Sequence, residues 1–326
     1  MIIVTGATGF IGSNIVADLN ARGRSDLLLV DDLGTQGKWK NIAKRRFLDL
    51  VDHRELDKLL PTLKTADAVF HMGANSSTTS TDGDEILRVN LHATMAWWKW
   101  CTHTATPFIY ASSAATYGDG SQGFDDAQDL EALEKLAPLN LYGWSKHQFD
   151  KWAVERASEG LAPPQWAGLK FFNVYGPNEY HKGDMRSLVA KNTELIRRGE
   201  TIRLFKSHKE GYADGAQLRD FVYVKDCCAV MMWLLDNRQV SGVFNLGTGQ
   251  ARSFVDLMQA IGTALGKPVN IEYVDMPESI RPNYQYFTQA RMEKIRAAGL
   301  TQVFYTLETG VADYARTYLI QADAYR

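Results

Sequence analysis

The sequence predicts an α/β fold in which a doubly wound, mostly parallel sheet is joined by a smaller α/β domain. Three observations support this prediction. The apolar segment 1–5 runs straight into a glycine-rich turn and then into a helical pattern. Strand-like segments at 27–30, 68–71, 107–111 and 169–173 alternate with helical stretches, as in a parallel sheet covered on both faces. After the last of these strands the pattern loosens into turn formers and mixed short elements, which predicts a second domain.

The first strand, turn and helix have the pattern of a dinucleotide-binding unit, so the predicted sheet is of the Rossmann type. Glycines in such a turn allow a tight bend and let a pyrophosphate approach the backbone, while the helix N-terminus favours an anion. The apolar segment 27–30 ends in Asp31, at the distance where an acidic side chain meets the adenosine ribose, and Asp32 follows it. The cofactor contacts predicted here are Gly6, Gly9, Phe10, Ile11, Gly12, Asp31 and Asp32.

Tyr142 and Lys146 are four positions apart, so they project from one face of a helix, one turn apart. A free tyrosine has a pKa of about 10, so general-base work near pH 7 needs a shift of roughly 3 units, or about 4 kcal/mol. An ammonium group about 4 Å away, at an effective dielectric constant of about 20, supplies about that much. The pair therefore predicts a proton-exchanging tyrosine whose pKa the lysine lowers. For the spacing taken alone, an ordinary amphipathic helix is the alternative.

The order of the segments predicts two domains whose segments interleave along the chain. Two later apolar segments, 220–224 and 243–246, are expected to return to the first domain. We therefore predict a nucleotide-binding domain made of residues 1–173 with about 220–247. The substrate-binding domain is predicted from about 174–219 with 248–326.

Composition and charge exclude several classes of partner. The 326 residues are 45% hydrophobic and carry a formal net charge of -2, without a basic block or zinc-ligand spacing, so neither nucleic acid nor a metal is expected. The longest apolar run, 227–235, is too short to cross a bilayer, and the chain opens on a strand rather than on a signal peptide. The three cysteines predict packed thiols rather than disulfides, as in a reducing compartment. We therefore expect a cytoplasmic enzyme with no membrane partner.

Motifs along nearly the whole chain resemble the extended short-chain dehydrogenase/reductases, in particular the family of nucleotide-sugar epimerases and dehydratases. Besides the features above, they are the serine segment 110–118 and the segments 172–177, 219–224 and 245–249. The resemblance implies that Ser113 hydrogen-bonds the reacting hydroxyl or carbonyl, that Tyr142 exchanges its proton, and that Lys146 binds the nicotinamide ribose. On the cofactor side it implies contacts at Lys38, His53, Met72, Gly73, Ala74, Asn75, Ser76 and Asn90.

Within this family, the segments 70–79, 181–183, 211–215 and 283–289 resemble the ADP-glycero-manno-heptose 6-epimerases. This implies inversion at C6 of ADP-D-glycero-D-manno-heptose, in the synthesis of lipopolysaccharide core precursors. Hydride transfer to an oxidised nicotinamide would give a 6-keto intermediate, and return of the hydride to the other face would complete the inversion. One proton donor is not expected to suit both poses, so the resemblance implies Lys182 as a second acid/base. The implied substrate contacts are Asn173, Val174, Lys182, Asp184, Lys191, Phe205, Arg219 and Tyr284.

Residue chemistry and resemblance favour different cofactors. Asp31 and Asp32 favour a ribose 2′-hydroxyl and would repel a 2′-phosphate, which indicates NAD. The heptose epimerases commonly hold NADP, and Lys38 and Lys40 could supply compensating charge, so we predict NADP, with NAD as the alternative. Three residues depart from the heptose-epimerase pattern and affect the fine contacts: His53, Asp184 and Lys191.

Three other functions are compatible with parts of the sequence. A 4,6-dehydratase shares the first oxidation but commonly carries an Asp-Glu pair after the serine position, where this chain has Ala114 and Ala115. Another nucleotide-sugar 4-epimerase is a second alternative, which a test with UDP-galactose beside the ADP-heptose would distinguish. A non-catalytic nucleotide-binding relative is disfavoured because Ser113, Tyr142 and Lys146 are all present. The resemblance further implies a homo-oligomer, specifically a pentamer.

Overall fold

A seven-stranded parallel sheet forms the centre of the protein. The computed structural model describes residues 1–278, 280–281 and 284–326, so Asn283, the first residue of the motif 283–289, lies outside the described residues. The strand order is β10-β6-β5-β4-β1-β2-β3, and every pair is parallel. The strands are β1 (Ile2–Thr5), β2 (Leu27–Val30), β3 (Asp49–Val51), β4 (Ala68–His71), β5 (Phe108–Ser113), β6 (Trp166–Phe171) and β10 (Gly242–Leu246). The predicted fold class is confirmed.

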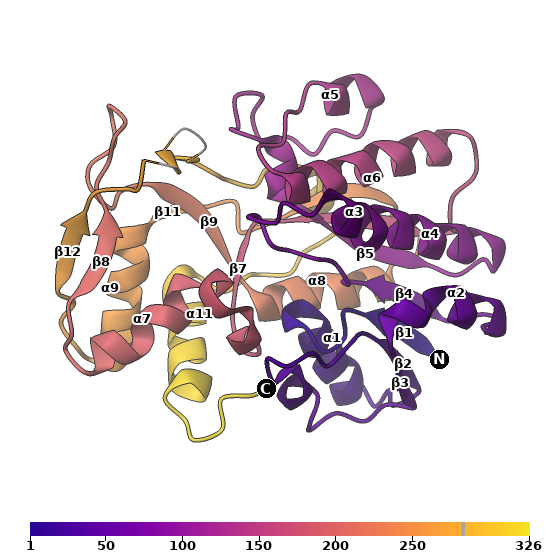
Figure 1. The fold of residues 1–326 in the computed structure, drawn as a ribbon, viewed down its shortest axis with the longest axis horizontal. Coiled ribbons are helices and arrows are strands. Elements are labelled where there is room, and N and C mark those ends of the chain that lie inside the picture. Colours follow the sequence, from indigo (N-terminus) through magenta and orange to yellow (C-terminus); the bar gives the residue numbers. More distant parts are fainter. Residues whose placement is uncertain (279, 282–283) are drawn as a thin grey trace.

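Two hydrophobic cores cover the two faces of this sheet. Successive side chains of a strand point to opposite faces, and on β1 Ile2 packs into one core while Ile3 packs into the other. The helices α1 (Phe10–Ala21) and α8 (Val224–Asp236) bury residues in the first core, and α4 (Ala93–His103) and α6 (Leu141–Ser158) bury residues in the second (Figure 1). The sheet is thus doubly wound, as its continuously apolar strands predict.

Two small sheets lie at the far end of the molecule from β3 (Figure 1). One contains β7 (Asn173–Tyr175), β9 (Leu218–Tyr223) and β11 (Ala251–Ser253); the other contains β8 (Ile202–Phe205) and β12 (Ile271–Val274). This arrangement corrects two predictions. The segment 169–173 is divided between β6 and β7, which belong to different sheets, and β9 pairs with β7 and β11 instead of returning to the large sheet. Within the segment 220–247, β10 joins the large sheet and the helix α8 packs in its first core.

Shorter elements connect these layers. The remaining α-helices are α2 (Leu56–Leu59), α3 (Gly83–Ile86), α5 (Leu130–Glu134), α7 (Leu188–Arg197), α9 (Phe254–Leu265), α10 (Glu293–Ala297) and α11 (Leu307–Tyr314). Turns of other helix types are Lys38–Asn41, His53–Glu55, Leu60–Thr62, Leu87–His92, Ala114–Tyr117, Tyr180–Met185 and Ala315–Leu319. Throughout residues 1–278, 280–281 and 284–326, no helix combines the length and the apolar character needed to cross a membrane.

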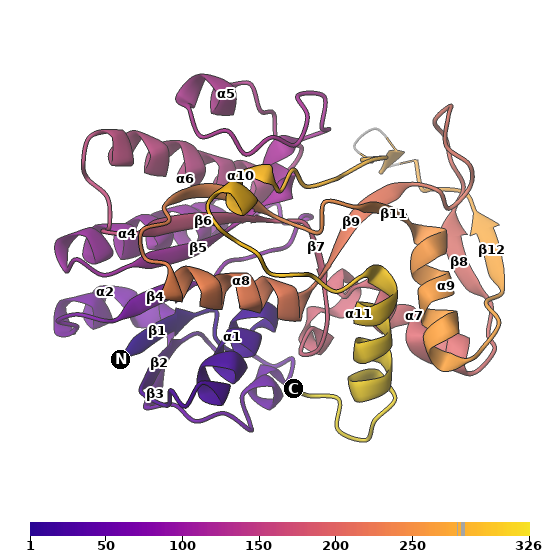
Figure 2. The same ribbon diagram turned by 180° about the vertical axis from the view of Figure 1, so that it is seen from behind.

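The last residues of the chain return to its first helix, so both ends of the sequence contribute to one surface (Figures 1 and 2). Arg326 forms an ion pair with Asp18 of α1, and its Nη1 donates to Asn14 Oδ1 at 3.2 Å. Its backbone N–H donates to Asn178 Oδ1 at 3.0 Å. Asn178 belongs to the segment that follows β7, so the chain end ties this segment to the nucleotide-binding unit.

Candidate active site

A cleft of about 730 Å³ opens at the carboxyl ends of β1, β4 and β5. The strand order reverses between β4 and β1, and ligands of open α/β sheets bind at such a switch point. Seventeen of the predicted site residues line this cleft: Gly6, Gly9, Phe10, Ile11, Gly12, Asp31, Lys38, Met72, Gly73, Ala74, Asn75, Ser76, Ser113, Tyr142, Lys146, Val174 and Lys182. The structure thus brings together residues that are up to 176 positions apart in the sequence (Gly6 to Lys182).

The glycine turn packs so closely against the loop after β4 and against itself that side chains at Gly6 and Gly12 would meet backbone. Gly6 has a φ of +62°, and a Cβ at this position would lie 2.6 Å from the backbone nitrogen of Gly73. A Cβ at Gly12 would lie 2.1 Å from the backbone oxygen of Gly6. Gly9 is the N-cap of α1, whose first amides therefore face the cleft side of the turn. The turn can hold the phosphates of a dinucleotide by its backbone.

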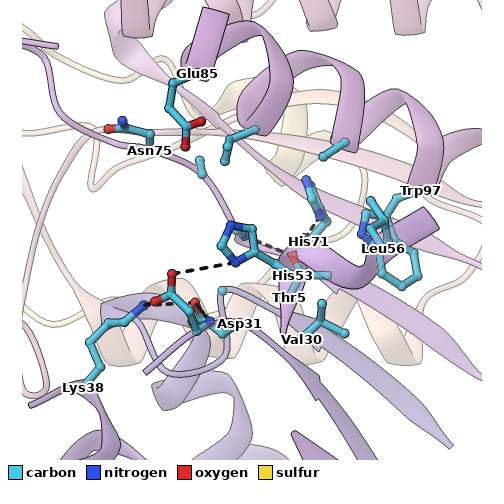
Figure 3. A pocket seen from close by; sticks show the side chains of 16 residues that line it. Thr5, Val30, Asp31, Lys38, His53, Leu56, His71, Asn75, Glu85 and Trp97 are labelled. Atoms are coloured by element: carbon cyan, nitrogen blue, oxygen red, sulfur yellow. Dashed lines mark hydrogen bonds and ion pairs between the residues drawn. The ribbon is translucent and has the colours of Figure 1, made fainter. Parts of the chain in front are cut away.

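A smaller pocket of about 220 Å³ adjoins the glycine turn on the side of β2. Figure 3 shows Asp31, Lys38 and His53 facing one another at its mouth. Asp31 Oδ2 accepts hydrogen bonds from the N–H and the hydroxyl of Thr8 at 2.8 and 2.6 Å, which fixes the carboxylate. Lys38 Nζ lies 3.0 Å from Asp31 and 2.6 Å from Asp32, and His53 Nδ1 lies 3.8 Å from Asp32. Burial disfavours the charged form of Lys38, but the negative charges of Asp31 and Asp32 have the larger combined effect. The pKa of Lys38 is therefore raised.

Asn90 lies behind the cleft wall and is fully buried. Its side-chain oxygen accepts from the backbone N–H of Asn75 at 2.8 Å, and its amide donates to the backbone oxygen of Asn75 at 2.9 Å. The same amide also donates to Ser145 Oγ of α6 at 3.1 Å. Asn90 therefore joins the cofactor-side loop after β4 to the helix that carries Tyr142.

Ser113, Tyr142 and Lys146 come together at the end of β5 and the first turns of α6. The side chain of Asn140 caps this helix by accepting from the Gly143 N–H at 2.8 Å, which fixes where the helix begins. Tyr142 therefore lies in the first turn and Lys146 one turn later. Ser113 Oγ accepts from the N–H of Ala115 at 3.1 Å, and its own proton can be donated to the Tyr142 oxygen or to a ligand.

The ionisation of this trio differs from the prediction. Burial raises the pKa of Tyr142 above its ordinary value, although the neighbouring Ser113 hydroxyl lowers it. The predicted net decrease caused by Lys146 is therefore not found in the protein alone, because desolvation of the phenolate dominates and the charge of Asp150 raises the pKa further. Burial also lowers the pKa of Lys146 to about 8, while Asp150 opposes that decrease. Lys146 is thus mostly protonated at neutral pH.

Lys182 reaches the same cleft from the segment that follows β7. It lies in the turn Tyr180–Met185, and its Nζ is 5.5 Å from the ring centroid of Phe10 in the glycine turn. Burial lowers the pKa of Lys182, and Glu179 opposes that decrease. The structure therefore places a partly desolvated amine and the Tyr142 phenol in one cavity.

The other predicted substrate residues lie outside the lining of this cleft. Phe205, Arg219 and Tyr284 form a cluster among themselves, with the Arg219 guanidinium 5.2 Å from the Tyr284 ring and the rings of Phe205 and Tyr284 6.4 Å apart. Arg219 donates to the backbone oxygen of Leu218 at 2.8 Å. The Asp220 carboxylate, on the next residue of β9, instead accepts hydrogen bonds from the Thr248 and Gly249 N–H groups.

Asn173, Asp184 and Lys191 also lie outside the lining of the cleft. Lys191 Nζ donates to the backbone oxygen of Asp184 at 2.5 Å, so two of the residues that depart from the heptose-epimerase pattern contact each other. Asn173 is the last residue of the strand expected at 169–173. In the structure it is the first residue of β7, so it belongs to the small three-stranded sheet. Its neighbour Val174 does line the cleft.

Several lining residues were missed by the sequence reasoning. The rule that carboxyl ends of parallel strands meet at one edge could have found those that end or follow β4, β5 and β6. His71 is an example: its Nδ1 is 2.8 Å from Thr5 Oγ1 and its Nε2 is 2.9 Å from Thr94 Oγ1. Missed residues of the large cleft are Gln36, Ser77, Ala111, Ser112, Phe171, Phe172, His181 and Met185. Those of the small pocket are Thr5, Val30, Leu56, His71, Glu85, Val89, Ala93 and Trp97.

A dinucleotide cleft with a serine, a tyrosine and a lysine at its reacting end defines a short-chain dehydrogenase/reductase type of protein. Residues 2–247 match the model of the NAD dependent epimerase/dehydratase family, and the chain belongs to that family.

Three known proteins show the range of this similarity. The ADP-L-glycero-D-manno-heptose-6-epimerase of Nitratidesulfovibrio vulgaris is 50% identical over 330 residues, with 100% of both chains covered. The crystal structure of the Helicobacter pylori ADP-L-glycero-D-manno-heptose-6-epimerase has a TM-score of 0.78 at 27% identity, covering 97% of this chain and 95% of that one. The Thermus thermophilus UDP-glucose 4-epimerase in complex with NAD has a TM-score of 0.73 at 26% identity, covering 97% and 98%. A nicotinamide cofactor therefore fits the cleft.

Proposed function

We propose that this protein inverts C6 of the heptose in ADP-D-glycero-D-manno-heptose to give the L-glycero isomer, in the synthesis of lipopolysaccharide core precursors. The observation that carries the proposal is the presence of Tyr142 and Lys182 in the same cleft as the glycine turn. Inversion through a ketone needs a proton to leave and return on two differently oriented sugars, and these side chains reach the cleft from different elements. The high identity to a heptose epimerase over the full chain supports the same substrate.

The glycine turn, Asp31 and Lys146 would hold a nicotinamide cofactor, which would supply reversible hydride transfer at C6 of the sugar. Tyr142 takes the proton of the C6 hydroxyl in one sugar orientation, and Lys182 acts as the acid/base in the other. Ser113 donates its free proton to the reacting oxygen and so fixes its position. Lys146, with a pKa of about 8, remains cationic at neutral pH and stabilises the Tyr142 phenolate and the cofactor ribose.

The ADP part of the substrate is proposed to contact the cluster of Phe205, Arg219 and Tyr284. Burial lowers the pKa of Arg219, so its guanidinium gains from an anionic partner such as a diphosphate. Asn173, Val174, Asp184 and Lys191 are proposed to contact the rest of the substrate. We propose the two predicted domains, except that β9 is assigned to the substrate-binding domain because it pairs with β7 and β11. The ADP-binding cluster then lies in the substrate-binding domain and the glycine turn in the nucleotide-binding domain.

NADP is proposed as the resident cofactor, with NAD as the alternative. Lys38 supports this choice because its ammonium pairs with both Asp31 and Asp32 and offsets one of the two negative charges that would repel a 2′-phosphate. Denaturing the purified protein and identifying the released nucleotide by mass tests the proposal. In addition, Lys38→Ala should weaken binding of NADP more than binding of NAD. Release of NAD alone from the wild-type protein would contradict the NADP assignment.

The reaction is tested by incubation with ADP-D-glycero-D-manno-heptose in deuterated water. Inversion without deuterium at C6 is expected, since the hydride returns from the cofactor, and deuterium at C6 would refute the route. Tyr142→Phe and Lys182→Met should each abolish most epimerisation; near-normal activity of Lys182→Met would leave Tyr142 as the only acid/base. Turnover of UDP-galactose in place of the heptose would favour a 4-epimerase.

We further propose a cytoplasmic enzyme that acts as a homo-oligomer, specifically a pentamer. Three free cysteines, all buried, support a reducing compartment. Sedimentation of the purified protein tests the oligomeric state.

A further inference from the structure

A buried ion pair lies behind the reacting end of the cleft. Lys170 of β6 and Asp150 of α6 approach to 3.2 Å between Nζ and Oδ2, and the side chains of both are 0% exposed. Desolvating two charges is costly, so a buried pair is often no more stable than apolar residues of similar volume. A contribution to the stability of the fold therefore does not explain why this ion pair is present.

Each charge of the pair has further hydrogen-bond partners. Asp150 accepts from Ser112 Oγ at 2.6 Å and from the Tyr110 hydroxyl at 3.0 Å. Lys170 donates to Thr116 Oγ1 at 2.7 Å. The Lys170 ammonium also lies 4.6 Å from the ring centroid of Tyr117. The network thus holds β5, β6 and the turn after Ser113 against α6.

The partners of the pair connect it to all three reacting residues. Thr116 Oγ1 donates to the backbone oxygen of Ser113 at 2.8 Å, and Ser112 precedes Ser113 in β5. Asp150 follows Lys146 by one helical turn and Tyr142 by two turns, so it lies on the same side of α6. The carboxylate therefore acts electrostatically on both groups.

The histidines and tyrosines packed around the pair are uncharged at neutral pH. Burial lowers the pKa of His71 on β4 to about 3 and that of His147 on α6 to about 4. Burial raises the pKa values of Tyr110 and Tyr117 well above their ordinary value. Among the charged groups, Asp126 also raises the pKa of Lys170, Asp126 and Asp125 raise that of Lys294, and Lys151 lowers that of His147. The charge that acts most directly on Lys146 is thus that of Asp150, and Lys170 is the charge paired with it.

We propose that Asp150 and Lys170 are positioning residues that set the charge at the reacting end of the cleft: Asp150 keeps Lys146 cationic, and Lys170 limits the effect of Asp150 on Tyr142. This inference rests on the proposed function, because it assigns the pair to the proton transfer of Tyr142. Neither residue touches the substrate. The pair sets the pH range over which Tyr142 can be a phenolate while Lys146 stays protonated.

The two charges predict opposite shifts of the pH profile. In the profile of kcat against pH, the acidic limb reports the ionisation of Tyr142 and the alkaline limb that of Lys146. The loss of the anion in Asp150→Asn makes both groups lose a proton more readily, so both limbs should move to lower pH by about one unit. In Lys170→Met the unbalanced carboxylate should move both limbs to higher pH by about one unit. The double variant, with a neutral pair, should have limbs close to those of the wild type. A loss of packing alone would not produce shifts of opposite sign.

Two variants control for structure. Lys170→Arg keeps the charge and should leave the limbs in place, and Ser112→Ala removes one hydrogen bond to Asp150 without changing a charge, so its limbs should also stay whatever its rate. Tyrosinate absorbance of the cofactor-loaded protein, measured against Tyr142→Phe, gives the ionisation of Tyr142 without turnover and should shift in the same directions.

Limbs that stay in place or move in the same direction in both single variants would overturn the proposal, as would a shift in Lys170→Arg equal to that of Lys170→Met. Failure of the proposed function is a separate outcome, since it appears as absence of heptose inversion by the wild-type enzyme. The tyrosinate titration would still decide the role of the pair in that case.

Discussion

The Cβ position of Gly143 lies 2.7 Å from the backbone oxygen of Ala115, so no side chain fits between the start of α6 and the turn after Ser113. Backbone atoms cannot move away as the end of a flexible side chain can. This close approach sets how near Tyr142, the preceding residue, comes to Ser113. Glycine at this position is thus part of the geometry of the active site.

Gly143→Ala should therefore separate α6 from the serine turn. We expect kcat to fall about 10- to 100-fold, since a displacement of about 1 Å in a reacting group has an effect of that size. Alanine is otherwise the better helix former by about 1 kcal/mol, so propensity cannot explain a loss. Gly83→Ala is the matched control, because a Cβ there meets no atom within 4 Å. Steady-state kinetics of the two variants tests the prediction, and unchanged kcat in Gly143→Ala would contradict it.

Arg326→Ala should destabilise the protein by about 1–3 kcal/mol, because it leaves the carboxylate of Asp18 largely buried without its partner. Burial already raises the pKa of Asp18 despite the arginine, which shows how much this carboxylate depends on compensation. Arg22→Ala breaks the exposed pair with Asp236 and should cost less than about 1 kcal/mol. Urea unfolding measures both changes, and equal losses would show that the chain end is not anchored through this pair.

Asn90→Ala should weaken cofactor binding about tenfold or more. The change leaves the N–H and the carbonyl of Asn75 without a partner, at a cost of about 1–3 kcal/mol per buried group. The loop after β4 can recover those bonds only by moving. Titration of the apoprotein with the cofactor measures the effect. Thr102→Ala, which removes a hydrogen bond within α4, serves as control and should leave the affinity unchanged.

Asp226 predicts a pH dependence of stability. Burial raises its pKa from 3.8 to about 7, so the native state holds the proton more tightly than the unfolded state does. The contribution of the group is then favourable below its unfolded pKa, and the free energy of unfolding decreases as pH rises from about 4 to about 7. Asp226→Asn removes this titration.

The stability of Asp226→Asn relative to the wild type should therefore increase between pH 5 and pH 8, by on the order of 2 kcal/mol. Thermal unfolding at the two pH values measures the difference. Asp236→Asn, at the exposed end of the same helix, should change stability by less than about 1 kcal/mol at both. A constant difference between Asp226→Asn and the wild type would contradict the prediction.

Local patterns allowed much of the fold and of the cofactor side to be predicted. The bounds of β2 and β4 agree with the expected segments, because a buried parallel strand is a continuous apolar run between turn formers. The strand prediction failed at 169–173 because the apolar run continues through a change of sheet. Sheet membership depends on pairing partners distant in sequence, and for the same reason the sequence did not show that β9 pairs with β7 and β11.

By itself, the sequence determined the features that depend on near neighbours: the glycine turn that leads into α1, Asp31 at the end of β2, and the helical spacing of Tyr142 and Lys146. Only the tertiary structure decided what those side chains meet. It places Lys182 near Phe10 and Asp150 against Lys170, which come from different elements. It also decided the direction of the Tyr142 pKa shift, because desolvation depends on how completely the whole fold encloses the phenol, and spacing along a helix carries no information about that enclosure.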